Sequence, residues 1–370
     1  MEILERIGVA VFALALMVAT GCVQRESSAG TQSTAGAGSG RLEVRQVDGP
    51  SLVGNQLGIA ATRQVSIYLP PSYAVDTGRR YPTLYLLHGI FDTDTTWTRP
   101  WPGSPIGFDS VQALMDRGIA AGALAEMIVV MPDAEKTCHY TNSPLMGDWE
   151  DFIARDLTAF VDSEYRTLDA VESRGIAGHS MGGHGAIKVG MRNTDVFSAI
   201  YGLSPSLLDW AADLSVENAA LAGLASLQSE SDLQNAHFYV QAIVGIGRCF
   251  SPDADDPPFL TDMPFTAEDG QVRRAEPGFE RWTGELPLHL IGRHADGLRQ
   301  LRGFRFDAGD AYQFTHIPVA AQAFSDALAG AGIEHRFDLY EGDHRNRLWG
   351  SDGRLYAELF PFFSQALASR

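Results

Sequence analysis

One serine in the sequence stands where the nucleophile of an acyl-transfer reaction would stand. Residues 178–182 read Gly-His-Ser-Met-Gly, which fits the pattern G-x-S-x-G with Ser180 at its centre. In this pattern the serine occupies a sharp turn between a strand and a helix, and the flanking glycines leave room for that turn. The apolar run before Ser180 and the small residues from Gly183 to Ala186 predict such a strand and helix. Ser180 is therefore the candidate nucleophile, against the alternative of a chance glycine-rich junction.

A nucleophilic serine needs a base, and the base needs an orienting acid. The chain order for this architecture is serine, acid, histidine. Among ten histidines, His344 lies four residues beyond the last predicted strand, residues 335–340, so its loop would carry the imidazole over the serine. His344 is the candidate base, and a surface loop histidine is the alternative.

The acid is expected just after the penultimate strand. Asp310, one residue beyond Gly309, is the first choice. Asp307 at the strand end and Asp209 after the preceding strand remain open as alternatives, because an acid from a neighbouring loop would reach the same imidazole nitrogen.

Two backbone amides are candidates for an oxyanion hole. The apolar run of residues 81–90 predicts a central strand that stops at His88-Gly89. In this type of site, one amide comes from the turn after that strand and the other from the residue after the nucleophile. Ile90 and Met181 are those residues, although His88-Gly89 alone would also suit an ordinary turn.

The elements that must position these groups alternate between strands and helices. Strands are predicted at residues 65–70, 81–90, 127–131, 174–179, 197–203, 304–307 and 335–340, and helices at 149–161, 318–328 and 355–367. Such alternation predicts an α/β fold with a mostly parallel central sheet and helices on both faces. The catalytic groups then gather at the carboxyl ends of the strands.

The N-terminal residues indicate export. Residues 1–21 contain a short apolar run typical of a signal peptide, and residues 19–22 resemble a bacterial lipobox in which Cys22 would be lipidated. An ordinary secretory signal is the alternative. Residues 22–41 are small and polar, which predicts a flexible linker to a domain at 42–370. We expect an exported protein of the cell envelope that contacts membrane only through the lipid anchor.

Composition and cysteine content restrict the partners. The net charge of −18 over 370 residues argues against nucleic acid as a partner. Cys138 and Cys249 remain as a pair that would form a disulfide in an oxidising compartment or stay as two buried thiols. Neither has the spacing of a metal site, and the proposed chemistry needs no metal or organic cofactor.

Several motifs together resemble a known family. They are Tyr-Leu-Pro-Pro-Ser-Tyr at 68–73, Tyr-Leu-Leu-His-Gly at 85–89, Val-Val-Met-Pro-Asp at 129–133, Trp-Glu-Asp-Phe-Ile at 149–153, the elbow at 178–186 and Gly-Asp-His at 342–344. From Val65 onward the chain resembles the serine esterases that include S-formylglutathione hydrolases, feruloyl and acetyl-xylan esterases, enterochelin-type esterases and mycolyl transferases. The resemblance implies an α/β-hydrolase fold with Ser180 as nucleophile, His344 as base, and Ile90 and Met181 as oxyanion donors.

The chain departs from that family in two places. Counting from Gly309, the position of the family's acid holds Tyr312, so Asp310 would have to act from two positions earlier. About a hundred residues, 204–302, separate two neighbouring strands and are expected to form a cap over the serine. Within this cap, residues 209–227 are predicted to be helical, and the acidic segment 253–264 is predicted to be an irregular loop without the spacing of a calcium site.

The function expected from the sequence is hydrolysis of a small or carbohydrate-linked carboxylic ester through an acyl-enzyme on Ser180. An acyltransferase of the same fold is one alternative. A non-catalytic envelope-binding lipoprotein on a decayed hydrolase scaffold is another, motivated by Tyr312. A peptidase of similar fold ranks below these because the wider motifs resemble esterases.

Overall fold

The computed structural model describes residues 38–100, 108–311, 313–350 and 352–368. The expected signal peptide, the lipidation site Cys22 and nearly all of the expected linker lie outside these residues, as does Tyr312. None of the helices in the described ranges is both long and apolar enough to span a membrane.

An eight-stranded sheet forms the centre of the domain. Its strands, in spatial order, are β1 (Arg41–Asp48), β2 (Thr62–Leu69), β4 (Ile128–Pro132), β3 (Thr83–Leu87), β7 (Arg174–His179), β8 (Ala199–Leu203), β11 (Gly303–Gly309) and β12 (Arg336–Tyr340). The six strands from β4 to β12 pair in parallel, and β1 and β2 add antiparallel strands at one edge. The predicted mostly parallel sheet is confirmed.

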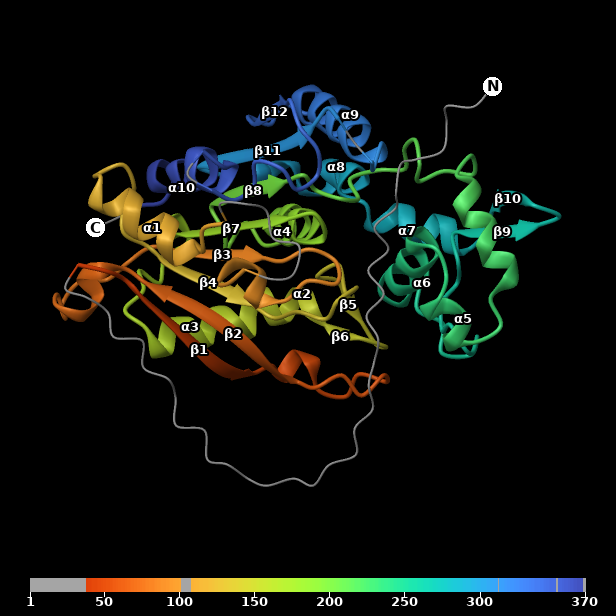
Figure 1. The fold of residues 1–370 in the computed structure, drawn as a ribbon, viewed down its shortest axis with the longest axis horizontal. Helices are drawn as coiled ribbons and strands as arrows, with labels where there is room; N and C mark the ends of the chain where they lie inside the picture. The colour runs from red at the N-terminus through yellow and green to blue at the C-terminus, as the bar shows by residue number, and fades with distance from the viewer. Residues whose placement is uncertain (1–37, 101–107, 312, 351, 369–370) are drawn as a thin grey trace, which may run out of the picture. The chain divides into compact units, whose positions relative to one another are not determined.

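Helices cover both faces of this sheet (Figure 1). Side chains alternate along the central strands, so that Tyr85 and Leu87 pack into one core cluster while Leu84 and Leu86 pack into the other. The first face carries α2 (Trp149–Asp151), the π-helix η4 (Phe152–Asp156), α3 (Leu157–Glu164), α4 (Met181–Arg192), α8 (Pro287–Leu298) and α9 (His316–Gly330). The opposite face carries α1 (Val111–Ala120), the π-helix η7 (Leu355–Leu359) and α10 (Phe360–Ala366).

The insertion between β8 and β11, residues 204–302, has its own secondary structure. Before α8 it contains the 3-10 helix η6 (Ala219–Ser226), α5 (Glu230–Gln234), α6 (Phe238–Phe250), β9 (Phe265–Glu268), β10 (Gln271–Arg274) and α7 (Gly278–Glu285). These elements lie beyond the carboxyl ends of the parallel strands (Figure 1).

The helix predicted at residues 209–227 is wrong for its first half. Ala212 has a φ of 44°, which breaks a right-handed helix, and only Ala219–Ser226 becomes helical. Trp210 instead stacks on Phe279 and Trp282 inside the insertion. Packing of this large, partly buried ring overrides the helical preference of the neighbouring alanines.

Candidate active site

Ser180 occupies a strained turn between β7 and α4. Its φ of 58° and ψ of −117° are unusual for a residue with a side chain, and such strain is typical of functional positions. A Cβ atom at Gly178 would lie 2.3 Å from the Gly182 carbonyl oxygen, and one at Gly182 would lie 2.2 Å from the Leu87 carbonyl oxygen. The two glycines are therefore required by the close approach of three backbone segments.

The predicted oxyanion amides lie beside this turn. A Cβ atom on Gly89 would come within 3.4 Å of the Ser180 Cβ, so the loop that carries Ile90 lies against Ser180. Met181 begins α4, and an N–H in the first turn of a helix has no intrahelical acceptor. Within the described part of the chain, neither the Ile90 nor the Met181 N–H has a hydrogen-bond partner from the protein. Both amides are thus available to an anion, as an oxyanion hole requires.

His344 is held against the turn at Ser180 through His179, the residue that precedes this serine. The His179 Nε2–H donates to the His344 carbonyl oxygen at 2.9 Å, and the two imidazole rings are 4.6 Å apart. Arg345 lies 3.6 Å from Asp92, which joins the histidine loop to the oxyanion loop. The described structure contains no hydrogen bond from the Ser180 hydroxyl to the His344 ring. The role of His344 as base stays a prediction, since catalytic contacts often tighten only when substrate binds.

The surroundings of His344 disfavour its charged form. Burial lowers the pKa of His344 well below its usual value, and the nearby His179, Arg345, Arg354 and His316 act in the same direction. Burial also lowers the pKa of His179 to about 3. Both rings are therefore neutral at pH 7, which is the form a general base needs.

The three acid candidates lie in different environments. Asp310 is exposed and accepts the Gly342 N–H at 3.0 Å, two residues before His344. Asp307 is buried and paired with Arg354, and Asp209 pairs with His289 at 3.0 Å. None of the three carboxylates is hydrogen-bonded to His344 in the described structure, so the acid role of Asp310 also stays a prediction.

Comparison with known proteins identifies the family. Residues 58–353 match the family model Esterase, whose description is "Putative esterase". The chain belongs to this Esterase family. A Mycobacterium tuberculosis protein named "Esterase Rv1288" is 34% identical over 128 residues, which cover 34% of this chain and 25% of that protein. The match therefore spans only a quarter of the length of that curated relative.

Solved structures show that this Esterase-family chain has the α/β-hydrolase fold. A structure titled "ferulic acid esterase" is 21% identical, with a TM-score of 0.60, and the match covers 89% of this chain and 99% of that one. A Staphylococcus aureus structure titled as a fluorophosphonate-binding serine hydrolase, FphF, is 18% identical, with a TM-score of 0.57 and coverage of 89% and 100%. The insertion between β8 and β11 is thus carried on a known hydrolase fold.

Sequence reasoning missed an aromatic cluster at the site of this Esterase-family chain. The ring of Phe314 lies 5.2 Å from His344 and 5.5 Å from Phe238 of the insertion, whose ring lies 6.2 Å from Phe91. Phe91 and Phe238 are 43% and 37% exposed, which is high for phenylalanine. The three rings come from distant segments, so no local pattern could have revealed them.

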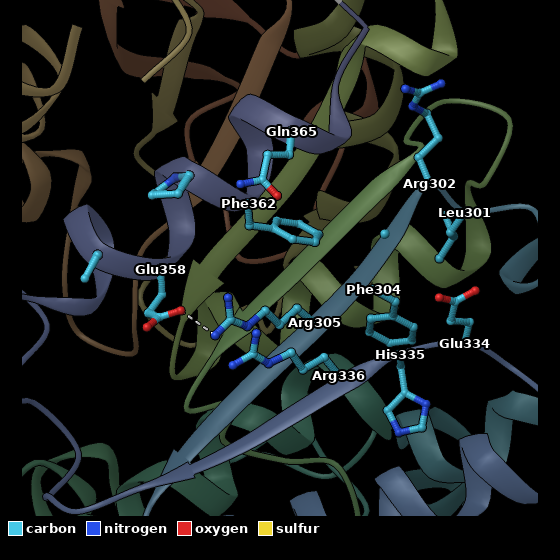
Figure 2. Close-up of a pocket in the computed structure, with 13 residues that line it drawn as sticks. Leu301, Arg302, Phe304, Arg305, Glu334, His335, Arg336, Glu358, Phe362 and Gln365 are labelled. Atoms are coloured by element: carbon cyan, nitrogen blue, oxygen red, sulfur yellow. Dashed lines mark hydrogen bonds and ion pairs between the residues drawn. The ribbon is translucent and has the colours of Figure 1, made fainter. Parts of the chain in front are cut away.

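A separate cavity lies at the other end of the sheet. It has a volume of about 470 Å³ and is formed by the first residues of β11 and β12 together with η7 and α10 (Figure 2). Arg305 in this cavity is bound to Asp338 and Glu358, and Arg336 is bound to Asp338. Two arginines of the cavity are therefore paired with carboxylates, and the cavity lies at the amino ends of β11 and β12.

Cys138 and Cys249 are both buried free thiols, so the described structure holds them as two separate side chains. Burial raises the pKa of each thiol. The described residues contain no cluster of three or more histidine, cysteine or acidic side chains that would suit a metal ion.

Proposed function

We propose that this protein is a serine carboxylic-ester hydrolase that acts through an acyl-enzyme. His344 takes the proton of the Ser180 hydroxyl as the oxygen attacks the ester carbonyl, and the Ile90 and Met181 amides stabilise the resulting oxyanion. The protonated His344 then gives its proton to the departing alcohol. Water attacks the acyl-enzyme by the same steps and releases the acid.

One observation carries this proposal. The strained Ser180 turn is contacted on one side by the loop of Ile90, and His344 is held beside it through His179. Ser180, His344 and the Ile90 loop lie at the carboxyl ends of neighbouring strands, and this arrangement supports the proposed roles of nucleophile, base and anion donor.

We propose a small or carbohydrate-linked ester as substrate, with an apolar or aromatic group that packs on Phe91, Phe238 and Phe314. Exposed phenylalanine rings lose unfavourable contact with water when a planar apolar group covers them. The similarity to a structure titled "ferulic acid esterase" supports a test of aromatic acyl groups.

The test uses a fluorescent fluorophosphonate probe and p-nitrophenyl esters of acetate, butyrate and an aromatic acid. We expect the wild-type protein to be labelled and to hydrolyse at least one ester, and Ser180→Ala to lose both properties without unfolding. Ser226→Ala, which changes an exposed serine of the insertion, serves as the control and should behave like wild type. An esterase rate retained in Ser180→Ala would rule out the mechanism.

An acyltransferase remains a second proposal because the core site suits either acceptor. Product analysis with and without a sugar or glycerol acceptor separates the two reactions. A decayed binding protein, the third proposal, predicts that the probe leaves Ser180 unlabelled.

We also propose export and lipidation at Cys22. Labelling of producing cells with an alkyne fatty acid tests this: wild type should carry the label and sediment with membranes, and Cys22→Ser should do neither. Label that persists in Cys22→Ser would contradict the anchor.

A further inference from the structure

His316 begins α9, is only 5% exposed and contacts an acceptor at each ring nitrogen. Its Nε2 lies 2.6 Å from the Ser206 carbonyl oxygen, and its Nδ1 lies 2.7 Å from Asp213 Oδ1. A carbonyl oxygen only accepts hydrogen bonds, so Nε2 must carry a proton. The protonation of Nδ1 then depends on the state of the Asp213 carboxyl group.

The contacts of Asp213 are those of an ionised carboxylate, because both of its oxygens accept hydrogen bonds. It accepts the backbone N–H of His316 at 2.7 Å, the N–H of Thr315 at 3.1 Å and the hydroxyl of Tyr239. An ionised carboxylate is only an acceptor, so Nδ1 of His316 also donates. A ring that donates from both nitrogens is an imidazolium cation.

This ion pair joins the insertion to both sides of the catalytic site. Asp213 belongs to the insertion. Ser206, which accepts from His316, donates its own N–H to the Ser180 carbonyl oxygen at 3.1 Å. Phe314, two residues before His316, packs 5.2 Å from the His344 ring. A single side chain therefore connects the segment behind the nucleophile with the segment beside the base.

We propose that His316 is protonated and acts as a positioning residue. Together with Asp213 it holds Ser206 and Phe314 in place and thereby fixes the position of Ser180 relative to His344. This inference rests on the proposed serine mechanism. It means that the insertion takes part in catalytic geometry as well as in the choice of substrate. His316 touches neither substrate nor reacting atoms, so it acts through Ser206 and Phe314.

A purely structural role must be separated from this one, because Asp213 also caps the N-terminus of α9. His316→Gln keeps one donor but loses the charge and the second donor. Asp213→Asn keeps the shape of the side chain but loses its charge. His289→Gln is the matched control, since His289 forms an exposed pair with Asp209 in the same insertion at 3.0 Å.

Two measurements test the proposal. The first is the ¹⁵N chemical shift of the histidine side chains in the intact wild-type protein at pH 7. We expect one imidazole with the shifts of a doubly protonated ring, absent from His316→Gln and present in His289→Gln. A neutral His316 ring would overturn the proposal even if His316→Gln fails to fold.

The second measurement is kcat and KM for a p-nitrophenyl ester, together with the rate of fluorophosphonate labelling. We expect His316→Gln and Asp213→Asn each to lower kcat by about 10- to 100-fold with little change in KM, since misplaced catalytic groups lower turnover. The double variant should lose no more than either single variant, because both break one contact. Variants that lose thermal stability but keep the wild-type kcat would show a structural role only and overturn the proposal. Wild-type protein that is neither labelled nor active would instead refute the proposed function, while the ¹⁵N shifts would still decide the charge of His316.

Discussion

Gly182→Ala, which adds a single methyl group, is the most direct test of the strand–turn–helix segment at Ser180. A Cβ atom there would lie 2.2 Å from the Leu87 carbonyl oxygen and 2.7 Å from the His88 carbonyl oxygen. Both are backbone atoms at the end of β3, so no rotation of a side chain relieves the overlap. Overpacking a core costs about 1–3 kcal/mol, and we expect Gly182→Ala to lose about 3 kcal/mol of unfolding free energy because backbone must move.

The same displacement should disable the site. Moving the start of α4 by about 1 Å shifts Ser180 and the Met181 amide away from the Ile90 loop, and such a misplacement lowers a catalytic rate by about 100-fold. Urea unfolding and the rate of fluorophosphonate labelling measure the two effects. Gly292→Ala is the control, because Gly292 is an exposed glycine of α8 with no atom within 4 Å of its Cβ position, and it should gain about 0.5–1 kcal/mol. A Gly182→Ala protein with wild-type stability and labelling would refute the close approach on which the elbow depends.

Two further predictions concern buried charge. Lys188 is fully buried, hydrogen-bonded to Thr141 at 2.9 Å and paired with Glu285 of the insertion. Lys188→Met should lower the free energy of unfolding by about 2 kcal/mol, because the partly buried Glu285 carboxylate loses this partner. Lys136→Met, at an exposed lysine, should lower it by less than about 0.5 kcal/mol, and urea unfolding measures both changes. Burial lowers the pKa of His139 to about 4 in the folded protein. Below pH about 6.5, His139 therefore binds a proton in the unfolded chain but stays neutral in the folded protein. The contribution of His139 to the free energy of unfolding is therefore fully present at pH 7 and is lost between pH about 6.5 and 4, by up to about 1.4 kcal/mol per pH unit. In His139→Gln, the free energy of unfolding measured with urea should depend less on pH across that range. An unchanged slope in His139→Gln would show that other groups cause the pH dependence.

The sequence was sufficient for seven of the eight strands of the central sheet and for the turn at Ser180, because both depend on local patterns; the edge strand β1 was not predicted. A strand buried on both faces is a continuous apolar run, and the strand predicted at residues 174–179 matches β7. The glycines around Ser180 were also readable, since they serve a turn formed by adjacent residues.

The contacts that the sequence could not show are long-range. Asp209, considered as an acid, pairs with His289 eighty residues away, and the partner of His316 is Asp213 in the insertion. Each pairing depends on how the insertion folds back onto the sheet, and the spacing of residues along the chain does not predict such contacts. The same limit explains why Phe91, Phe238 and Phe314 were missed.

Asp307, at the end of β11, is one of the candidates for the orienting acid, but its side chain already has several partners. Asp307 accepts hydrogen bonds from Tyr201 at 3.1 Å and the Ser204 N–H at 3.1 Å, and it is paired with Arg354. If Asp307 turned toward His344, a buried arginine would lose this partner, which is strongly destabilising. Asp307 is thus best suited to anchor the segment behind the nucleophile.

Asp310 lies in a different position. One of its oxygens accepts the Gly342 N–H at 3.0 Å, and the Ala311 N–H donates to the Gly342 carbonyl oxygen at 3.0 Å. The loop after β11 is therefore hydrogen-bonded to the loop that carries His344, at a position two residues before this histidine. A carboxylate has a second oxygen that can accept a further hydrogen bond, and the Asp310 side chain is exposed. Of the three candidates, only Asp310 is attached to the base loop without being committed to another charged partner, and this keeps it the leading candidate for the orienting acid.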